Sequence, residues 1–225
     1  MMRLSEDARG VYVIAITPFT DTGALDLEGC DKLVDFYLEA GATGLTVLGM
    51  MGEAPKLTVE ESRTVVGRIL KRVQGRVPVV AGVSAPGFAQ IDALTKMVMG
   101  DGAAGVMIAP PGSLRTDDQI VGYYTQVAEL IGDVPFVLQD FPLATGVQMS
   151  VSTIARIVNT PARGETDEPE ARNPEPALAG SKPAPSRAPR GLSRASDRSP
   201  SARAYTTVRL THAAAASRRR GAYGV

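Results

Sequence analysis

The chain has 225 residues with 24 basic and 24 acidic side chains, but its zero net charge hides two unlike parts. Residues 1–160 contain 12 basic and 18 acidic residues and residues 161–225 contain 12 and six, so the two parts carry net charges of −6 and +6. The single cysteine, Cys30, excludes an internal disulfide framework. No apolar run approaches the roughly 20 residues of a membrane span, and the N-terminus lacks the apolar core of a signal peptide, so we expect a cytoplasmic protein.

Up to residue 159, short apolar runs alternate with segments of helical periodicity. The runs are apolar throughout, as in a parallel sheet that is buried on both faces. The helices begin at recognisable caps: Thr58 with Glu61 has capping-box spacing, and Ser150 opens the last helix. In chain order we expect strands at 11–19, 44–49, 78–84, 105–110 and 135–142, and helices at 26–40, from 58 to about 73, 88–99, 117–131 and 151–159.

This order predicts an α/β protein of about five βα units. An open doubly wound sheet and a (β/α)8 barrel both fit it. A complete TIM barrel usually needs about 250 residues, so a barrel here is a partial one. The segment 204–211 (AYTTVRLT) is the best later strand candidate, but it is isolated and carries Arg209, and we do not count it. The first and fifth strands would then be unpaired edges, which favours weak stability, dimerisation through the edges or insolubility.

Residues 161–225 have a different composition from the preceding domain, residues 1–160. They contain no Ile, Phe or Met and eight of the 16 prolines. Such a segment cannot bury enough apolar surface to offset its ordering entropy, so we predict a disordered basic tail. The change to residues with GC-rich codons follows directly after VSTIARIVNT. We interpret the tail as a frameshifted reading that truncates a longer barrel, with a genuine low-complexity extension as the alternative.

Four motifs together point to a family: ITPFTDTGALDLEGCDKLVDFYLEAGATGLTVLG, GMMGEAPKLTVEES, VPVVAGVS and VPFVLQDFPLATGV. Over residues 8–160 the chain resembles the dihydrodipicolinate synthase and N-acetylneuraminate lyase family of Schiff-base aldolases. The resemblance implies a TIM barrel, a homo-oligomer, and cleavage or condensation of a 2-oxo acid such as pyruvate. It implies an imine with a lysine on the sixth strand, without a metal or organic cofactor. It places eight residues around the substrate: Thr17, Gly49, Met50, Met51, Gly52, Glu53, Gln139 and Asp140.

Three positions depart together from the family pattern. Met50 and Met51 stand where the family carries two hydroxyl residues, and Pro111-Gly112 replaces a tyrosine pair. Gln139 replaces the tyrosine that acts as general acid and base. Methionine donates no hydrogen bond, and glutamine does not titrate near pH 7. The joint departure indicates a divergent subgroup with another substrate. We interpret the two methionines as pocket lining, with simple core filling as the alternative.

No lysine of the chain matches the imine lysine that the resemblance implies. Three lie on predicted helices, Lys56 lies in the loop after the second strand, and Lys182 lies in the tail. We therefore expect the chain as written to be inactive, with Lys56 the first suspect if an imine forms. The helix lysines are Lys32, Lys71 and Lys96.

Other patterns have structural explanations. Gly100–Gly105 matches G-x-G-x-x-G, but a helix precedes it and a strand follows, which reverses the order of a dinucleotide site. Asp117 and Asp118 open a helix and complement its dipole. The only histidine, His212, lies in the tail, so we expect no metal site.

Two rival functions remain open. The first is a non-catalytic module that binds a 2-oxo acid. The second is an interaction protein that acts through the basic tail, where arginines would give nonspecific attraction to nucleic acid at most.

Overall fold

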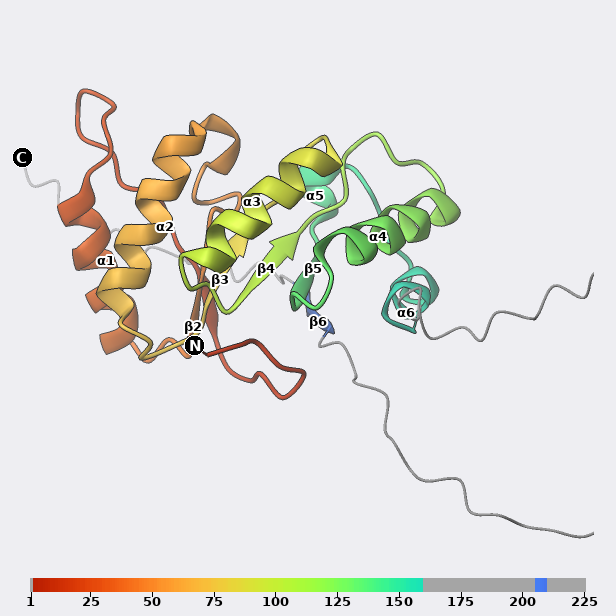
Figure 1. Cartoon of the computed structure of the whole chain (residues 1–225), viewed down its shortest axis with the longest axis horizontal. Helices are drawn as coiled ribbons and strands as arrows, with labels where there is room; N and C mark the ends of the chain where they lie inside the picture. Colours follow the sequence, from red (N-terminus) through yellow and green to blue (C-terminus); the bar gives the residue numbers. More distant parts are fainter. Residues whose placement is uncertain (1, 160–204, 210–225) are drawn as a thin grey trace, which may run out of the picture. The chain divides into compact units, whose positions relative to one another are not determined.

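The computed structural model describes residues 2–159 and 205–209 (Figure 1). All strand pairs in the sheet are parallel, and the strands lie side by side in the order of the sequence. The first five form a curled half-barrel, which confirms the partial-barrel prediction. The strands are β1 (Tyr12–Ile14), β2 (Gly44–Val47), β3 (Val79–Gly82), β4 (Gly105–Ile108), β5 (Phe136–Asp140) and β6 (Tyr205–Arg209).

The helices lie along one side of the sheet, where α1 to α4 follow one another in Figure 1. The predicted caps are confirmed: Thr58 forms a capping box with Glu61, and the Ser150 hydroxyl accepts a hydrogen bond from the Thr153 amide at 3.1 Å. A short helix after β5 and a 3-10 helix, η1, were not predicted. The helices are α1 (Leu27–Glu39), η1 (Ala54–Lys56), α2 (Val59–Val73), α3 (Phe88–Gly100), α4 (Asp117–Ile131), α5 (Pro142–Thr145) and α6 (Val151–Asn159).

The core lies mainly between the sheet and the helices. Alternate strand residues such as Leu45 and Val47 point towards the helices and join one large apolar cluster with residues of α2, α3 and α4. The other face carries a smaller cluster, in which Leu4 of the N-terminal segment covers three strand residues. The Leu4 amide donates to the carbonyl oxygen of Ala104 at 2.9 Å, which fixes that segment across the sheet. The three covered residues are Val80, Met107 and Val137.

The sheet is buried at its centre and half-buried at β1. Every residue of β2, β3 and β4 is buried, whereas all three residues of β1 are intermediate in exposure. The expectation of a strand over 11–19 buried on both faces is therefore wrong. After Ile14 the chain makes one further ladder bond, from the Ala15 amide to Thr46, and then leaves the sheet.

A second correction concerns the segment that the sequence analysis did not count as a strand. Residues Tyr205–Arg209 form β6 and pair in parallel with β5, with Phe136 opposite Tyr205 and Asp140 opposite Arg209. Strand β5 is therefore not an edge. Parallel pairing is a non-local contact that no pattern within the segment could indicate. The rest of the predicted disordered tail, including Lys182 and His212, lies outside the described residues.

Two arginine–aspartate pairs join α1 to α2 on the outer surface. Arg68 donates two hydrogen bonds to Asp31, at 2.8 and 2.5 Å. One turn further along both helices, Arg72 binds Asp35 in the same two-point geometry. Because both partners advance by four residues, the pairs form a ladder between parallel helices. The hydrogen bonds from Arg72 lower the pKa of Asp35.

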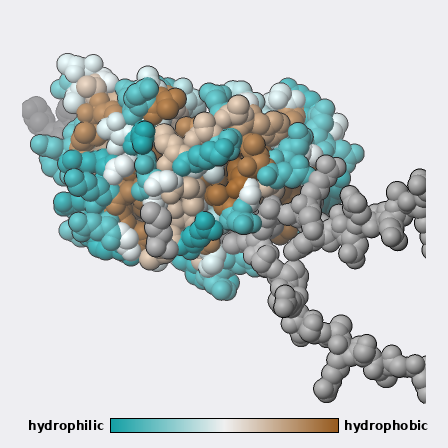
Figure 2. All heavy atoms as spheres, viewed as in Figure 1, coloured by the Kyte–Doolittle hydropathy of each residue, from teal (hydrophilic) through white to brown (hydrophobic). Residues whose placement is uncertain are grey.

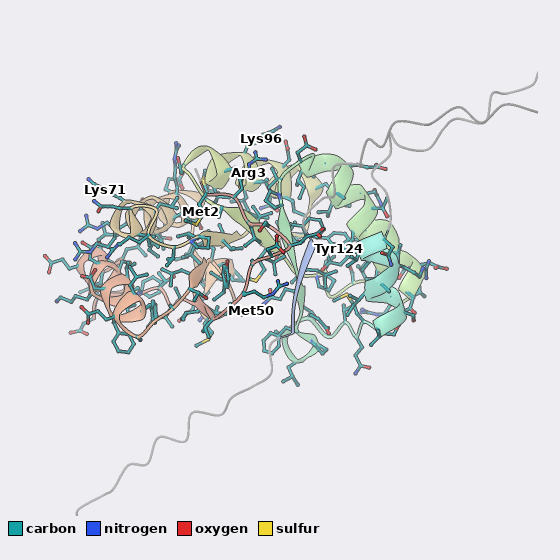
Figure 3. The ribbon with its side chains drawn as sticks, turned by 90° about the horizontal axis from the view of Figure 1, so that it is seen from below. Met2, Arg3, Met50, Lys71, Lys96 and Tyr124 are labelled. Carbon is teal, nitrogen blue, oxygen red and sulfur yellow. The ribbon has the colours of Figure 1, made fainter. Side chains whose placement is uncertain are left out.

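Four aromatic rings link α3, α4 and β5. Phe88 at the start of α3 stacks on Tyr123, with 5.6 Å between ring centroids. Tyr123 meets Tyr124 edge to face at 5.2 Å, and Tyr124 stacks on Phe136 at 6.2 Å. Burial raises the pKa of Tyr123 to about 12. The Tyr124 hydroxyl donates to the carbonyl oxygen of Ile108 at 3.1 Å, so this row ties α4 to the sheet. Tyr124 is labelled in Figure 3.

Candidate functional site

The loop after β2 folds tightly against β1 at the carboxyl end of the sheet. The Gly52 amide donates to the carbonyl oxygen of Gly49 at 3.1 Å, and the Glu53 amide donates to that of Met50 at 3.1 Å. Thr17 is buried, and its hydroxyl donates to the carbonyl oxygen of Gly52 at 2.7 Å. The structure therefore brings Thr17 together with the loop 49–53, through the loop backbone.

The two methionines of this loop face solvent. Met50 is 40% exposed and Met51 61% exposed. Neither lines the cavity that contains Gln139, nor the larger hollow described below. Their interpretation as pocket lining stays a prediction that the structure does not support directly.

Gln139 lies on the concave face of the half-barrel. It is buried near the end of β5 and lines a cavity of about 90 Å³. Thr46 of β2 is equally buried and lines the same cavity, together with Ile14 and Met107. The sequence analysis missed Thr46. The available signal was its inward position as the one hydroxyl residue in the apolar run GLTVLG.

Asp140 takes the opposite face of β5, because neighbouring strand residues alternate in direction. Its Oδ1 atom is buried and has no hydrogen-bond partner among the described residues. It lies close enough to Tyr124 that its charge adds to the larger effect of burial in raising the pKa of that phenol. The structure therefore separates Asp140 from Gln139, and a substrate contact by Asp140 stays a prediction.

The described lysines lie on the outside of the fold. The Lys56 ammonium is 2.6 Å from a carboxylate oxygen of Glu53, three residues earlier, and its side chain is 74% exposed. Lys96 is paired with Asp92 at 2.6 Å, one helical turn away. Glu53 is thus paired with the lysine of its own loop, and a substrate contact by Glu53 stays a prediction.

A larger hollow of about 630 Å³ lies beside the loop at the carboxyl ends of β2, β3 and β4. Its lining carries no charged side chain, and Ser84 within it accepts a hydrogen bond from the Ala109 amide at 2.9 Å. The sequence analysis did not find this hollow, because its walls come from three separate loops and two helices. Other residues that line it are Leu57, Ser62, Pro86, Gln90, Leu94 and Ser113.

The geometry of residues 2–159 and 205–209 bears on metal binding, on membrane spans and on the glycine pattern. Within these ranges, no group of three or more His, Cys, Asp or Glu side chains is placed to hold a metal ion. No helix of the described chain is both long and apolar enough to cross a membrane. The glycine pattern 100–105 has the predicted structural explanation, since α3 ends at Gly100 and β4 begins at Gly105.

Parallel βα units with polar positions at the carboxyl ends of the strands define a (β/α)8-barrel protein, here represented by a half-barrel. Residues 7–163 match the model of the dihydrodipicolinate synthetase family. The chain belongs to this family, as the four sequence motifs had indicated.

Two curated relatives show how much of the family protein is present. The 4-hydroxy-tetrahydrodipicolinate synthase of Thiobacillus denitrificans is 32% identical over 155 residues, which are 68% of this chain and 52% of that protein. The enzyme of the same name from Pseudomonas aeruginosa is 33% identical over 153 residues, again 68% and 52%. The chain thus spans about half the length of the curated relatives it matches.

Solved structures agree with the fold. A dihydrodipicolinate synthase from Rhodopseudomonas palustris is 51% identical with a TM-score of 0.68, over 70% of this chain and 52% of that one. The chloride-inhibited enzyme of Acinetobacter baumannii, complexed with pyruvate, is 29% identical with a TM-score of 0.64, over 68% and 53%. A monomeric dihydrodipicolinate synthase variant is 34% identical with a TM-score of 0.63, over 67% and 50%.

Proposed function

We propose that this chain carries the substrate-holding first part of a 2-oxo acid lyase or aldolase. We also propose that the chain as written binds a 2-oxo acid without forming an imine. The observation that carries the proposal is the pair of buried polar residues, Gln139 and Thr46, that face one cavity on the concave side of the half-barrel. Family membership and the pyruvate in the solved Acinetobacter relative support the substrate class.

The cavity offers two buried neutral hydrogen-bonding groups to the ligand, and the exposed Arg9, whose guanidinium donates to the carbonyl oxygens of Glu6 and Ala8, also lines it. The Gln139 amide supplies two donors and an acceptor, and the Thr46 hydroxyl supplies one donor. A volume of about 90 Å³ has room for several waters or for a molecule of a few heavy atoms. Neither group exchanges protons near neutral pH, so both can orient a keto or carboxylate oxygen but neither can act as general acid or base.

The lysines favour binding without imine formation. Imine chemistry needs a neutral amine that attacks the ketone carbon. The Lys56 ammonium is paired with Glu53 at 2.6 Å on the outside of the fold, and Lys56 does not line the Gln139 cavity. Lys32, Lys71 and Lys96 belong to helices on the outer side of the sheet.

Borohydride trapping with pyruvate, followed by intact mass, tests the absence of an imine. We expect no adduct on the full chain. A stoichiometric adduct would contradict the proposal, and its loss in Lys56→Gln would identify Lys56 as the residue that has taken the role.

Ligand-observed NMR with pyruvate tests binding itself. We expect binding that weakens about fivefold in Gln139→Met, which keeps the length of the side chain but removes its hydrogen bonds, since one hydrogen bond contributes about 1 kcal/mol. Asp21→Asn, at an exposed turn, serves as the matched control and should leave binding unchanged. If neither pyruvate nor 2-oxoglutarate binds the folded protein, the proposed function is wrong.

The family resemblance extends the proposal to assembly and compartment. We keep a homo-oligomer in the cytoplasm as the expectation. Sedimentation of the purified chain tests the assembly. The monomeric relative is a precedent for the opposite outcome, a monomer.

A further inference from the structure

Two adjacent methionines are exposed to solvent at the carboxyl end of the sheet, whereas the other internal methionines are buried or partly buried. Met51 is 61% and Met50 40% exposed, and Met107 on β4 is 3% exposed. The remaining internal methionines, Met97, Met99 and Met149, are partly buried against the core. Only Met2, near the N-terminus, is comparably exposed among the described methionines, at 49%. Met50 is labelled in Figure 3.

The backbone of the loop explains why these side chains do not turn inward. A Cβ atom on Gly49 would lie 2.9 Å from Ile14 Cγ2, and one on Gly52 would lie 3.1 Å from the Ala15 carbonyl oxygen. Both glycines are therefore pressed against the first strand and its continuation, and Thr17 fixes the second one by its hydrogen bond. The two residues between the glycines are left on the outer side of a fixed turn.

Displaying two thioethers in this way has an energetic cost. Complete burial of a methionine side chain is worth about 1.5–3 kcal/mol, and this loop forgoes part of that at two adjacent positions. Methionine is also the apolar side chain that peroxides oxidise, at a rate that follows exposure. The surface of Figure 2 has scattered apolar patches, but single exposed apolar residues need no special explanation. A fixed pair of adjacent thioethers is a different feature.

We propose that Met50 and Met51 form a reversible oxidation site for hydrogen peroxide or an alkyl hydroperoxide. The thioether sulfur attacks one peroxide oxygen, the O–O bond breaks and an S–O bond forms. The sulfur loses two electrons to become a sulfoxide, and the peroxide is reduced to water or an alcohol. A dithiol reductase reverses the step, with the sulfoxide oxygen leaving as water and the dithiol becoming a disulfide.

The site is linked to the ligand cavity through Gly49, and this extension rests on the proposed function. A Cβ atom on Gly49 would lie 3.5 Å from the methyl carbon of Met107, which lines the Gln139 cavity. Each sulfoxide makes its side chain larger and more polar, which disturbs the turn that holds Gly49 close to Met107. Met107 is part of the cavity wall, so oxidation of the loop weakens binding of the 2-oxo acid.

Peptide mass mapping after limited treatment with hydrogen peroxide tests the site. We expect a gain of about 16 Da per oxygen, first at Met51 and then at Met50. Both should react well before Met97, Met99 and Met149, with Met107 protected until the protein unfolds. Met2 is the reference for an exposed methionine outside the loop. Methionine sulfoxide reductase with a dithiol should remove the added oxygens. Equal rates at all internal methionines, or sulfoxides that the reductase cannot remove from the folded chain, would overturn the proposal.

Pyruvate binding before and after oxidation tests the coupling. We expect binding to weaken about fivefold on oxidation, as for the loss of one hydrogen bond, and to recover after reduction. The double variant Met50→Leu/Met51→Leu keeps apolar side chains that cannot be oxidised, and its binding should not respond to peroxide. Unchanged binding in the oxidised wild-type protein would overturn the coupling. If untreated protein does not bind pyruvate, the proposed function is wrong. The peptide mass mapping still tests the oxidation site independently of that result.

Discussion

The centre and the edge of the sheet are built from similar apolar strands but differ in burial. β3 reads VVAG and all four residues are buried, whereas β1 reads YVI and all three are half-exposed. Both strands are followed by a helix that packs on the same side. The difference lies in the second neighbour: β3 is hydrogen-bonded to β2 and β4, and β1 only to β2 within the described residues. Burial of a strand is therefore set by its neighbours and not by its own composition.

Substitutions at the centre of the sheet should reduce stability far more than substitutions on the surface. The largest expected effect is that of a substitution at a closely packed glycine. A Cβ atom on Gly82 would lie 2.1 Å from the carbonyl oxygen of Leu48, a backbone atom that cannot swing aside. Leu48 is itself held in a left-handed conformation with φ 54°. We expect Gly82→Ala to lower the free energy of unfolding by about 3 kcal/mol, measured by urea denaturation.

A matched glycine provides the control. Gly67 lies within α2, and a Cβ atom there would meet nothing within 4 Å. Gly67→Ala should raise the free energy of unfolding by about 0.5–1 kcal/mol, because alanine is the better helix former. Equal effects of the two substitutions would show that the close approach of Gly82 and Leu48 does not exist in solution.

Substitution of one valine at the centre and one at the edge of the sheet compares the stability that the two regions contribute. Val47 of β2 is buried and Val13 of β1 is half-buried, and both pack against the helix-side cluster. Val47→Ala should cost about 2 kcal/mol and Val13→Ala less than about 1 kcal/mol in urea unfolding, since an exposed site leaves no closed cavity. Equal losses would mean that β1 is covered in solution by something outside the described residues.

Loss of an arginine–aspartate pair between α1 and α2 should have the smallest effect on stability, and this effect depends on pH. The hydrogen bonds from Arg72 lower the pKa of Asp35, so the unfolded chain takes up the proton first as the pH falls. The contribution of Asp35 to stability is complete above the ordinary aspartate pKa, about 4, and is lost as the pH falls through the lower folded value. Both side chains are partly exposed, so the contribution is small.

Thermal melts of Asp35→Asn and wild type at several pH values test this. The variant should melt slightly lower at pH 7, and the two curves should converge in strong acid. Asp21→Asn, at an exposed turn, should follow wild type throughout. A gap that widens on acidification would contradict the sign.

Local signals made much of this fold predictable. Thr58 with Glu61, and Ser150 with Thr153, fix helix starts through contacts within one turn, and the structure has them as predicted. The short helix α5 also had local signals, Pro142 at its start and Gly146 at its end, but the apolar run before it was read as strand through Pro142. Strand ends were overestimated for the same reason, since apolar character continues beyond the last ladder bond.

Non-local features could not be predicted. Residues Tyr205–Arg209 form a strand because β5 offers an edge, and that partner lies more than 60 residues earlier in the chain. In the site, Gln139 was found through the family resemblance. Thr46 had a local signal, as the one hydroxyl residue in the apolar run GLTVLG, but the cavity that it shares with Gln139 became visible only when the strands were placed side by side. Asp140 was grouped with Gln139 although the alternation of side chains along the strand separates them.

The aromatic row between α4 and the sheet gives the chain an internal optical reporter. The protein has no tryptophan and six tyrosines, so the near-ultraviolet signal comes largely from phenol rings. Tyr123 and Tyr124 are fixed at 5.2 Å from each other in a chiral, dry environment. Near-ultraviolet circular dichroism, which disappears when side chains lose fixed packing, should therefore follow the docking of α4 onto β5 without any introduced label.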